Sequence, residues 1–298
     1  MTICCTPEKF DDSRDNFSAR HTHYLIANPF WQSDSGVKSY TDYAFSEINK
    51  IFSRSSVINR FSDESLFSFR ARLAREVKRL VDAGEKVVVE APECDASTAE
   101  IPIGMAAVHI RLHCSRQLGA WLQGQDVDEG AIALEQREIS RANYISGPSL
   151  SAIRVSRALF EIPASTCCYP NPAPKLNQSI ANENGKGFAL FVGRFHRLKG
   201  THWVLEIAKK MPDLEFVMRG PNLSKLNARR VPANIRFENG LELAKADVYR
   251  GARAVVVSSL YETASMVGIE ALSLGIPIVS WGHLGIAEYA ESPAIQSV

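Results

Sequence analysis

Two glutamates eight residues apart, Glu262 and Glu270, are the strongest candidates for chemistry in this chain. Glu262 follows a predicted strand, and Glu270 lies within the next predicted helix. Eight helical residues turn through about 800° and rise about 12 Å, so we expect both carboxylates on one side of the helix and far apart. The predicted helix N-terminus between them offers backbone N–H groups and a positive dipole end to a phosphate, at Ala264, Ser265, Met266 and Val267.

The order of carboxylate, phosphate site and carboxylate matches a ligand with hydroxyls at both ends and negative charge in the middle. A sugar joined through a diphosphate to a ribose is such a ligand. On spacing alone, Glu262 and Glu270 are also compatible with two ordinary helix glutamates, because acidic residues are favoured near helix starts in any case.

A glycine and two basic residues follow another predicted strand, in the stretch 191–200. Gly193 lets the chain turn tightly away from the strand. Arg194 and Lys199 are spaced to converge on a diphosphate, the arginine through its planar fork and the lysine as a point charge. A basic loop exposed to solvent is the alternative interpretation.

The first half of the chain offers weaker candidates. His113 ends the apolar run Ile110-Arg111-Leu112-His113 and is expected to point into a cleft between two domains. Gly36 lies in a loop between a predicted strand and helix, where a backbone approaches a phosphate closely in many proteins. A structural histidine and an ordinary loop glycine remain the alternatives.

The cysteines indicate neither a metal site nor a disulfide framework. The six cysteines form two adjacent pairs and two single residues, without a C-x-x-C spacing. His109 and His113 lie near Cys114, but a second Cys/His cluster at ligand spacing is missing from the sequence. We therefore expect reduced thiols and no bound metal at these residues. No cofactor is expected either.

Composition narrows the class of protein. A length of 298 residues favours two domains, and 45% hydrophobic with 22% charged residues is typical of a globular chain. The net charge of +1 gives no reason to expect nucleic acid as a partner. The sequence shows neither an apolar run long enough to cross a membrane nor a secretory signal at its start, so we expect a cytoplasmic protein.

The elements that must position these residues alternate along the chain. In the first half, strands are predicted at 24–29, 86–89, 107–112 and 144–146, and helices at 38–51, 67–82, 129–141 and 149–160. In the second half, strands are predicted at 188–192, 214–218, 235–237, 254–258 and 277–281, and helices at 201–211 and 264–274. This alternation favours parallel βαβ units in an α/β fold, with ligands at the carboxyl ends of the strands.

Two halves of this kind predict two Rossmann-like, doubly wound parallel-sheet domains. Residues 1–20 are polar and are interpreted as a leader. The segment 172–187, rich in Pro, Asn and Gly, is interpreted as a linker between an N-terminal domain at 21–171 and a C-terminal domain at 188–298.

Taken together, these residues resemble glycosyltransferase family 4, whose members are retaining enzymes of the GT-B fold. The resemblance rests on Gly193-Arg194 followed by Lys199-Gly200, on the glutamate pair, and on the run from Ala271 to Val279. Segments of the first half, at 90–93, 110–113, 135–143 and 170–172, recur in this order in members that build bacterial surface polysaccharides. The resemblance covers roughly residues 22–290.

The resemblance implies two domains facing a cleft and a role for each candidate residue. Arg194 and Lys199 would neutralise the donor diphosphate, Glu270 would bind ribose hydroxyls, and Glu262 would hold the transferred sugar. The N–H groups of Ala264 to Val267 would cap the phosphates, and His113 would line the sugar site. Transfer from a nucleotide-diphosphate-sugar to a saccharide or lipid-linked acceptor would then proceed with retention and without a metal.

The sequence departs from the family pattern in three places. The usual glycine pair of the first loop is Ser35-Gly36 here, and Thr263-Ala264-Ser265 replaces a glycine-rich stretch after the first glutamate. Members usually continue beyond the position of Val298, so the C-terminal domain is expected to be short. A non-catalytic sugar-nucleotide- or partner-binding relic and a sugar-nucleotide epimerase therefore remain alternative functions.

A basic helix predicted at 67–82 raises one further hypothesis. Its cationic residues at 70–79 would let the protein rest peripherally on anionic lipid at the inner face of the plasma membrane and so meet a lipid-linked acceptor. A helix face exposed only to water is the alternative.

Overall fold

The computed structural model describes residues 21–32, 35–175, 187–221, 231–239, 243–289 and 295–297. The described residues form two compact units. Unit 1 comprises those of Met1–Trp121 and Gln125–Pro172, and unit 2 comprises those of Leu122–Gly124 and Ala173–Val298. The predicted leader at 1–20 and most of the predicted linker at 172–187 lie outside the described residues.

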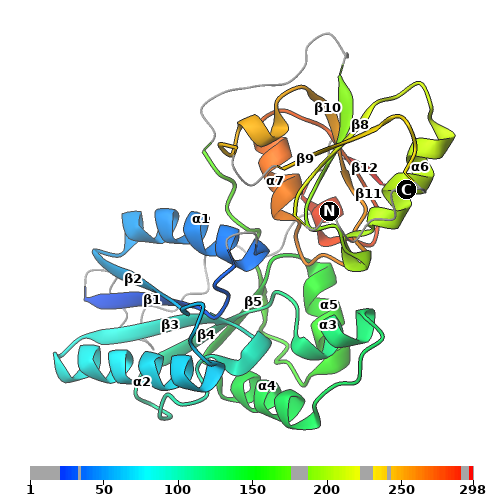
Figure 1. Cartoon of the computed structure of the whole chain (residues 1–298). Helices are drawn as coiled ribbons and strands as arrows, with labels where there is room; N and C mark the ends of the chain where they lie inside the picture. Colours follow the sequence, from blue (N-terminus) through cyan, green and yellow to red (C-terminus); the bar gives the residue numbers. More distant parts are fainter. Residues whose placement is uncertain are drawn as a thin grey trace. The chain divides into compact units, whose positions relative to one another are not determined.

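Unit 1 is built on a six-stranded sheet in which every pair of neighbouring strands is parallel (Figure 1). The strand order is β2-β1-β3-β4-β5-β6. Its strands are β1 (Thr22–Asn28), β2 (Arg54–Asn59), β3 (Lys86–Pro92), β4 (Ala107–Arg111), β5 (Tyr144–Gly147) and β6 (Cys167–Cys168). Its α-helices are α1 (Gly36–Ile51), α2 (Leu66–Asp82), α3 (Arg116–Leu122), α4 (Glu129–Arg141) and α5 (Leu150–Leu159).

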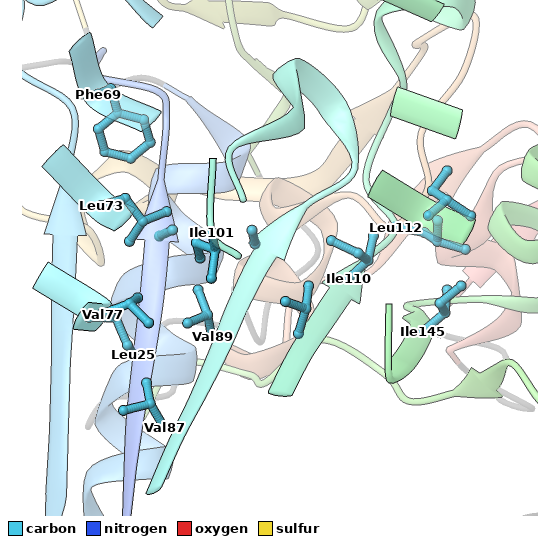
Figure 2. Close-up of a cluster of buried hydrophobic side chains, with 14 of the residues drawn as sticks. Leu25, Phe69, Leu73, Val77, Val87, Val89, Ile101, Ile110, Leu112 and Ile145 are labelled. Atoms are coloured by element: carbon cyan, nitrogen blue, oxygen red, sulfur yellow. The ribbon is translucent and has the colours of Figure 1, made fainter. Parts of the chain in front are cut away.

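Alternate residues of the central strands divide the interior of unit 1 into two faces. Leu25 and Val89 contribute to one hydrophobic cluster together with Leu73 and Val77 of α2, as Figure 2 shows. Ile139 of α4 belongs to the same cluster. The opposite face carries polar contacts to α1, where the Tyr40 hydroxyl donates to Glu90 Oε1 at 2.6 Å. Because side chains alternate along a strand, helices pack on both faces of this sheet.

Unit 2 holds the second six-stranded parallel sheet, in the order β12-β11-β10-β7-β8-β9. Its strands are β7 (Phe188–Val192), β8 (Phe216–Arg219), β9 (Ile235–Glu238), β10 (Ala252–Val257), β11 (Ile278–Ser280) and β12 (Ile295–Ser297). Helix α6 (Thr201–Lys210) packs Val204 and Ala208 onto β7 and β8, while α7 (Met266–Ser273) contacts β10 and β11.

The predicted fold class is confirmed, since both sheets are parallel and helices connect their strands. Two details of the prediction are wrong. Helix α7 begins at Met266, two residues after the predicted start, because the Ser265 side chain caps it by accepting the N–H of Gly268 at 3.2 Å. Gly36 is the first residue of α1 rather than part of a loop, and a Cβ added there would contact nothing within 4 Å.

Four elements were missed by the sequence patterns: the strands β2, β6 and β12 and the helix α3. Strand β2 is an edge strand of sequence RSSVIN, with no fully buried residue. Strand β6 has only two residues and helix α3 only seven. Within the described residues, no helix is long and apolar enough to cross a membrane.

Candidate functional site

The carboxyl ends of β7 and β8 in unit 2 come very close together. Gly193 leaves β7 with a φ of +149°, a conformation that favours glycine, and its N–H donates to the Arg219 carbonyl at 2.9 Å. Gly220 follows β8, and a Cβ there would lie 1.9 Å from the Gly193 carbonyl oxygen. Both positions therefore require glycine, although only Gly193 was predicted to matter.

A second close approach joins the segment after β7 to the segment after β10. Gly200 has a φ of +68°, and a Cβ there would lie 1.8 Å from the Ser258 carbonyl oxygen. The Ser258 hydroxyl donates to the Lys199 carbonyl at 2.9 Å, and the Leu260 N–H donates to the Leu198 carbonyl at 2.8 Å. These contacts fix the backbone of Lys199 beside the segment that leads to Glu262.

The side chains of Lys199 and Glu262 form an ion pair at this point. The Lys199 ammonium donates to Glu262 Oε1, which also accepts the Ser259 hydroxyl at 2.8 Å. Lys199 is 33% exposed and Glu262 is 16% exposed, so a solute has access to both charged groups. The structure therefore brings together two residues that lie 63 positions apart in the sequence and that were predicted to share a site.

The geometry predicted for Glu262 and Glu270 on one continuous helix is wrong. Glu262 lies four residues before the first residue of α7, so the helical rotation between the two glutamates does not apply. Glu262 is held in the loop after β10, where its own carbonyl accepts the Gly285 N–H at 3.0 Å. Only Glu270 belongs to the helix.

Glu270 is almost fully buried and is held by two groups that the sequence did not reveal. The Tyr249 hydroxyl donates to Glu270 Oε2 at 2.5 Å, and the Lys245 ammonium donates to Glu270 Oε1 at 2.9 Å. Lys245 is about half exposed, whereas Tyr249 is fully buried. Both residues lie outside the helices and strands that were predicted from the sequence.

The other predicted donor-binding residues of unit 2 lie around the same strand ends. Arg194 directly follows Gly193 and is exposed. Ala264, Ser265 and Met266 are buried and Val267 is half-buried at the start of α7. Ser259 was also missed. The sequence did carry a signal for it, because this serine directly follows the strand predicted at 254–258 and lies three positions before Glu262.

His113 lies in unit 1, buried two residues after the end of β4. Its ring packs edge-on against Tyr40, with 4.8 Å between ring centroids. It lines a small pocket together with Glu90 and Arg111. Burial and the nearby Arg111 charge lower the pKa of His113 to about 3, so the imidazole is neutral at physiological pH.

Buried carboxyl groups surround the loop between β3 and β4. Glu93 accepts the backbone N–H of His113 at 2.7 Å, and Glu135 accepts that of Asp95 at 3.0 Å. Burial raises the pKa of Glu93 to about 8 and the pKa of Glu135 to about 7. Burial also raises the pKa of Glu138 to about 7, although Glu138 accepts the Thr98 N–H.

These raised values predict that unit 1 loses stability as the pH rises. Glu93 ionises near its ordinary value of 4.5 in the unfolded chain but near 8 in the folded chain, so the folded state binds more protons in between. The free energy of unfolding should therefore fall from about pH 5 to about pH 8. Urea unfolding at several pH values should show a shallower fall in Glu93→Gln. Glu135 and Glu138 supply the rest of the fall, and His113, whose pKa is lowered, opposes it below about pH 6.5. Identical slopes in the variant and the natural protein would contradict this assignment.

Comparisons with known proteins agree with this architecture. Residues 173–294 match the family model described as Glycosyl transferases group 1. A 177-residue region is 25% identical to a D-inositol 3-phosphate glycosyltransferase of Gordonia bronchialis and covers 52% of this chain and 38% of that protein. The aligned part of this chain thus spans well under half the length of this curated relative.

Two solved structures show the same fold. A sucrose-phosphate synthase from Thermosynechococcus elongatus has a TM-score of 0.68 at 14% identity, covering 92% of this chain and 84% of its own. The catalytic domain of Starch Synthase IV from Arabidopsis thaliana, bound to ADP and acarbose, has a TM-score of 0.65 at 9% identity, covering 93% and 85%. The fold is that of GT-B glycosyltransferases, and the match to the Glycosyl transferases group 1 model lies within unit 2.

Proposed function

We propose that this protein is a retaining glycosyltransferase that takes its sugar from a nucleotide-diphosphate-sugar bound to unit 2. The observation that supports this most directly is the cluster of Lys199, Ser259 and Glu262 at the carboxyl ends of β7 and β10. Ligands of parallel α/β sheets bind at these ends. The Glycosyl transferases group 1 match over residues 173–294 supports the same proposal.

Each charged group has a role that suits its chemistry. Arg194 and Lys199 neutralise the donor diphosphate, Glu262 accepts hydroxyls of the transferred sugar, and Glu270 accepts hydroxyls of the ribose. Gly193 allows the backbone to approach the diphosphate. The remaining donor contacts come from the start of α7, at Ala264, Ser265, Met266 and Val267.

Donor binding must open the ion pair between Lys199 and Glu262. The ammonium then turns to the diphosphate and the carboxylate to the sugar, so each group exchanges one charged or polar partner for another. As the bond from the sugar to the diphosphate breaks, Lys199 and Arg194 stabilise the negative charge that develops on the leaving group. We propose that the acceptor attacks from the same face as the departing diphosphate, through an oxocarbenium-like state, with neither a protein nucleophile nor a metal.

The acceptor in this proposal is a saccharide or a lipid-linked acceptor of bacterial polysaccharide or glycoconjugate biosynthesis. Within the described residues, no three His, Cys, Asp or Glu side chains gather to hold a metal ion.

A non-catalytic nucleotide-sugar-binding protein and a sugar-nucleotide epimerase are the competing functions. An epimerase needs no acceptor, whereas a transferase does, and this difference separates the two.

The proposal is tested by incubating the protein with nucleotide-sugars, with and without a bacterial lipid extract as acceptor. Sugar should appear on an acceptor with its anomeric configuration retained, and nucleoside diphosphate should be released in equal amount. An altered nucleotide-sugar formed without acceptor would favour an epimerase. Donor binding without any turnover would favour the non-catalytic alternative.

We also propose that this protein works in the cytoplasm and contacts the inner face of the plasma membrane through α2. Arg72, Arg75 and Arg79 line a surface groove together with Glu76 and with Ile58 of the edge strand β2. The Arg72 guanidinium lies 4.3 Å from the centre of the Phe61 ring, and Phe61 is 58% exposed. Cations beside an exposed aromatic ring suit an anionic lipid surface.

Liposome co-sedimentation tests this contact. We expect binding to vesicles with 30% phosphatidylglycerol at low salt, and a loss of about 30-fold or more in Arg75→Glu/Arg79→Glu, because each basic residue near the surface contributes roughly 1 kcal/mol. Lys209→Glu/Lys210→Glu, on α6 of unit 2, provides the matched control and should bind like the natural protein. Absence of binding at low salt would exclude this membrane contact.

A further inference from the structure

Two tryptophans lie in contact at the carboxyl ends of the strands of unit 2. Trp281 directly follows β11, and Trp203 lies in the first turn of α6, the next α-helix after β7. Their rings meet edge to face, with 6.1 Å between the ring centroids. Trp203 is 42% exposed although its side chain is large and mostly apolar. The exposed part of this ring is therefore available to a ligand.

This tryptophan pair is continuous with the cluster of Lys199, Ser259 and Glu262. The Trp281 indole N–H donates to the Ser258 carbonyl at 3.2 Å, and the Ser258 hydroxyl donates to the Lys199 carbonyl at 2.9 Å. All of these residues belong to unit 2. A ligand on the tryptophan pair would therefore lie beside the residues that are proposed to hold the transferred sugar.

Polar groups surround the exposed ring of Trp203. The His202 ring packs against it, with 4.8 Å between the ring centroids. Partial burial and the nearby Arg197 charge lower the pKa of His202, so its imidazole is neutral at physiological pH and carries one donor and one acceptor. Both His202 and Arg197 are exposed. In the described part of the chain, the side chains of Arg197, His202 and Trp203 make no hydrogen bond.

We propose that these side chains form a saccharide subsite, which binds the acceptor at sugars beyond the one that reacts. The subsite consists of Arg197, His202, Trp203 and Trp281. The choice of a saccharide rests on the proposed function, in which the neighbouring cluster holds a sugar. A pyranose ring presents C–H groups on its face, which pack on an aromatic ring, and hydroxyls at its edge, which both donate and accept hydrogen bonds. An exposed indole beside a neutral imidazole and a guanidinium offers partners for both.

The test measures saccharide binding in the absence of a sugar donor. The natural protein and its variants are applied to an array of defined bacterial oligosaccharides, and the glycans that bind are titrated by calorimetry. We expect the natural protein to bind a subset of these glycans. In Trp203→Ala the affinity should fall by about tenfold or more, the loss typical for truncating a tryptophan at the centre of a binding surface. Trp203→Phe should keep most of the affinity, because it keeps an aromatic ring.

Two further variants and a second ligand sharpen the test. Trp121→Ala is the matched control, because Trp121 is also an exposed tryptophan, at 71%, but belongs to unit 1. This variant should bind glycans like the natural protein. His202→Ala should weaken glycan binding by about three- to tenfold, since it removes hydrogen bonds but leaves the tryptophan ring. The affinity for nucleoside diphosphates should be the same in all of these proteins, because none of the substituted residues is a proposed donor contact.

The outcomes distinguish this inference from the function on which it rests. If no glycan binds but a nucleoside diphosphate does, the saccharide subsite is overturned and the proposed function stands. If glycans bind through Trp203 but no nucleotide binds, the proposed function fails and the acceptor role fails with it.

Three further results would overturn the subsite. Equal losses of glycan affinity in Trp203→Ala and Trp121→Ala would show that the tryptophan pair has no special role. A loss of nucleotide affinity in Trp203→Ala would assign this ring to stacking on a base. A loss of liposome binding in Trp203→Ala, with glycan binding unchanged, would assign it to a lipid surface.

Discussion

Lys199→Ala and Glu262→Ala are each expected to reduce sugar transfer by at least about 100-fold, the loss typical for removing one group that stabilises developing charge. On the proposed mechanism, Lys199→Ala removes a cation from the leaving diphosphate. On the same proposal, Glu262→Ala removes the acceptor for hydroxyls of the transferred sugar. Both side chains are partly exposed, and the ion pair is removed without opening the core, so the melting temperature should change little.

A surface ion pair on the neighbouring helix serves as the control for this prediction. Lys209 and Glu206 of α6 also form an ion pair, and both are about half exposed. Lys209→Ala should leave transfer unchanged. The double variant Lys199→Ala/Glu262→Ala should be no worse than the more damaged single variant, because the two groups act on one step. Normal turnover by either single variant would contradict the site assignment.

Gly200→Ala is expected to have the largest effect on stability, a loss of about 3 kcal/mol or more in the free energy of unfolding. The backbone at Gly200 is left-handed, with a φ of +68°, and the new methyl group would lie 1.8 Å from the Ser258 carbonyl oxygen. Since that contact holds Lys199 beside the Glu262 loop, transfer should fall along with stability. Urea unfolding and the transfer assay measure the two effects separately.

Gly124 offers a closely matched control for backbone strain. Its φ of +65° is nearly the same, but a Cβ there would meet nothing within 4 Å. Gly124→Ala should therefore cost only about 1–2 kcal/mol, the penalty of the left-handed conformation alone, and should leave transfer intact. Equal losses of stability in the two variants would show that the close approach to Ser258 contributes nothing.

Elements with strong local signals were predicted closely from the sequence. Helix α4 has the predicted bounds, Glu129–Arg141, because Asp128 caps its start by accepting the Gly130 and Ala131 N–H groups. Strand β7 also has its predicted bounds, since its apolar run ends at a glycine. Strand β2 was missed because its polar sequence becomes a strand only through pairing with β1.

The candidate site also contains some residues that the sequence pointed to and others that come together only when the chain folds. The family resemblance predicted a shared site for Lys199 and Glu262, and the structure places them in contact. The partners of Glu270 escaped prediction, because Lys245 and Tyr249 reach it only after the chain folds around β10. The requirement for glycine at position 220 was missed for the same reason. The Gly193 carbonyl oxygen, which leaves no room for a Cβ at Gly220, follows a different strand.

The most direct test of the central claim is a thermal-shift screen of the natural protein against UDP, GDP, ADP, CMP and their common sugar conjugates. A ligand present at 100 times its Kd should stabilise the folded state by roughly 2.7 kcal/mol, which gives a clear rise in melting temperature. We expect one family of nucleotides to raise the melting temperature, and Glu270→Ala to abolish that rise. No rise with any nucleotide, in a protein that shows a cooperative melting transition, would contradict the claim that unit 2 binds a nucleotide-sugar.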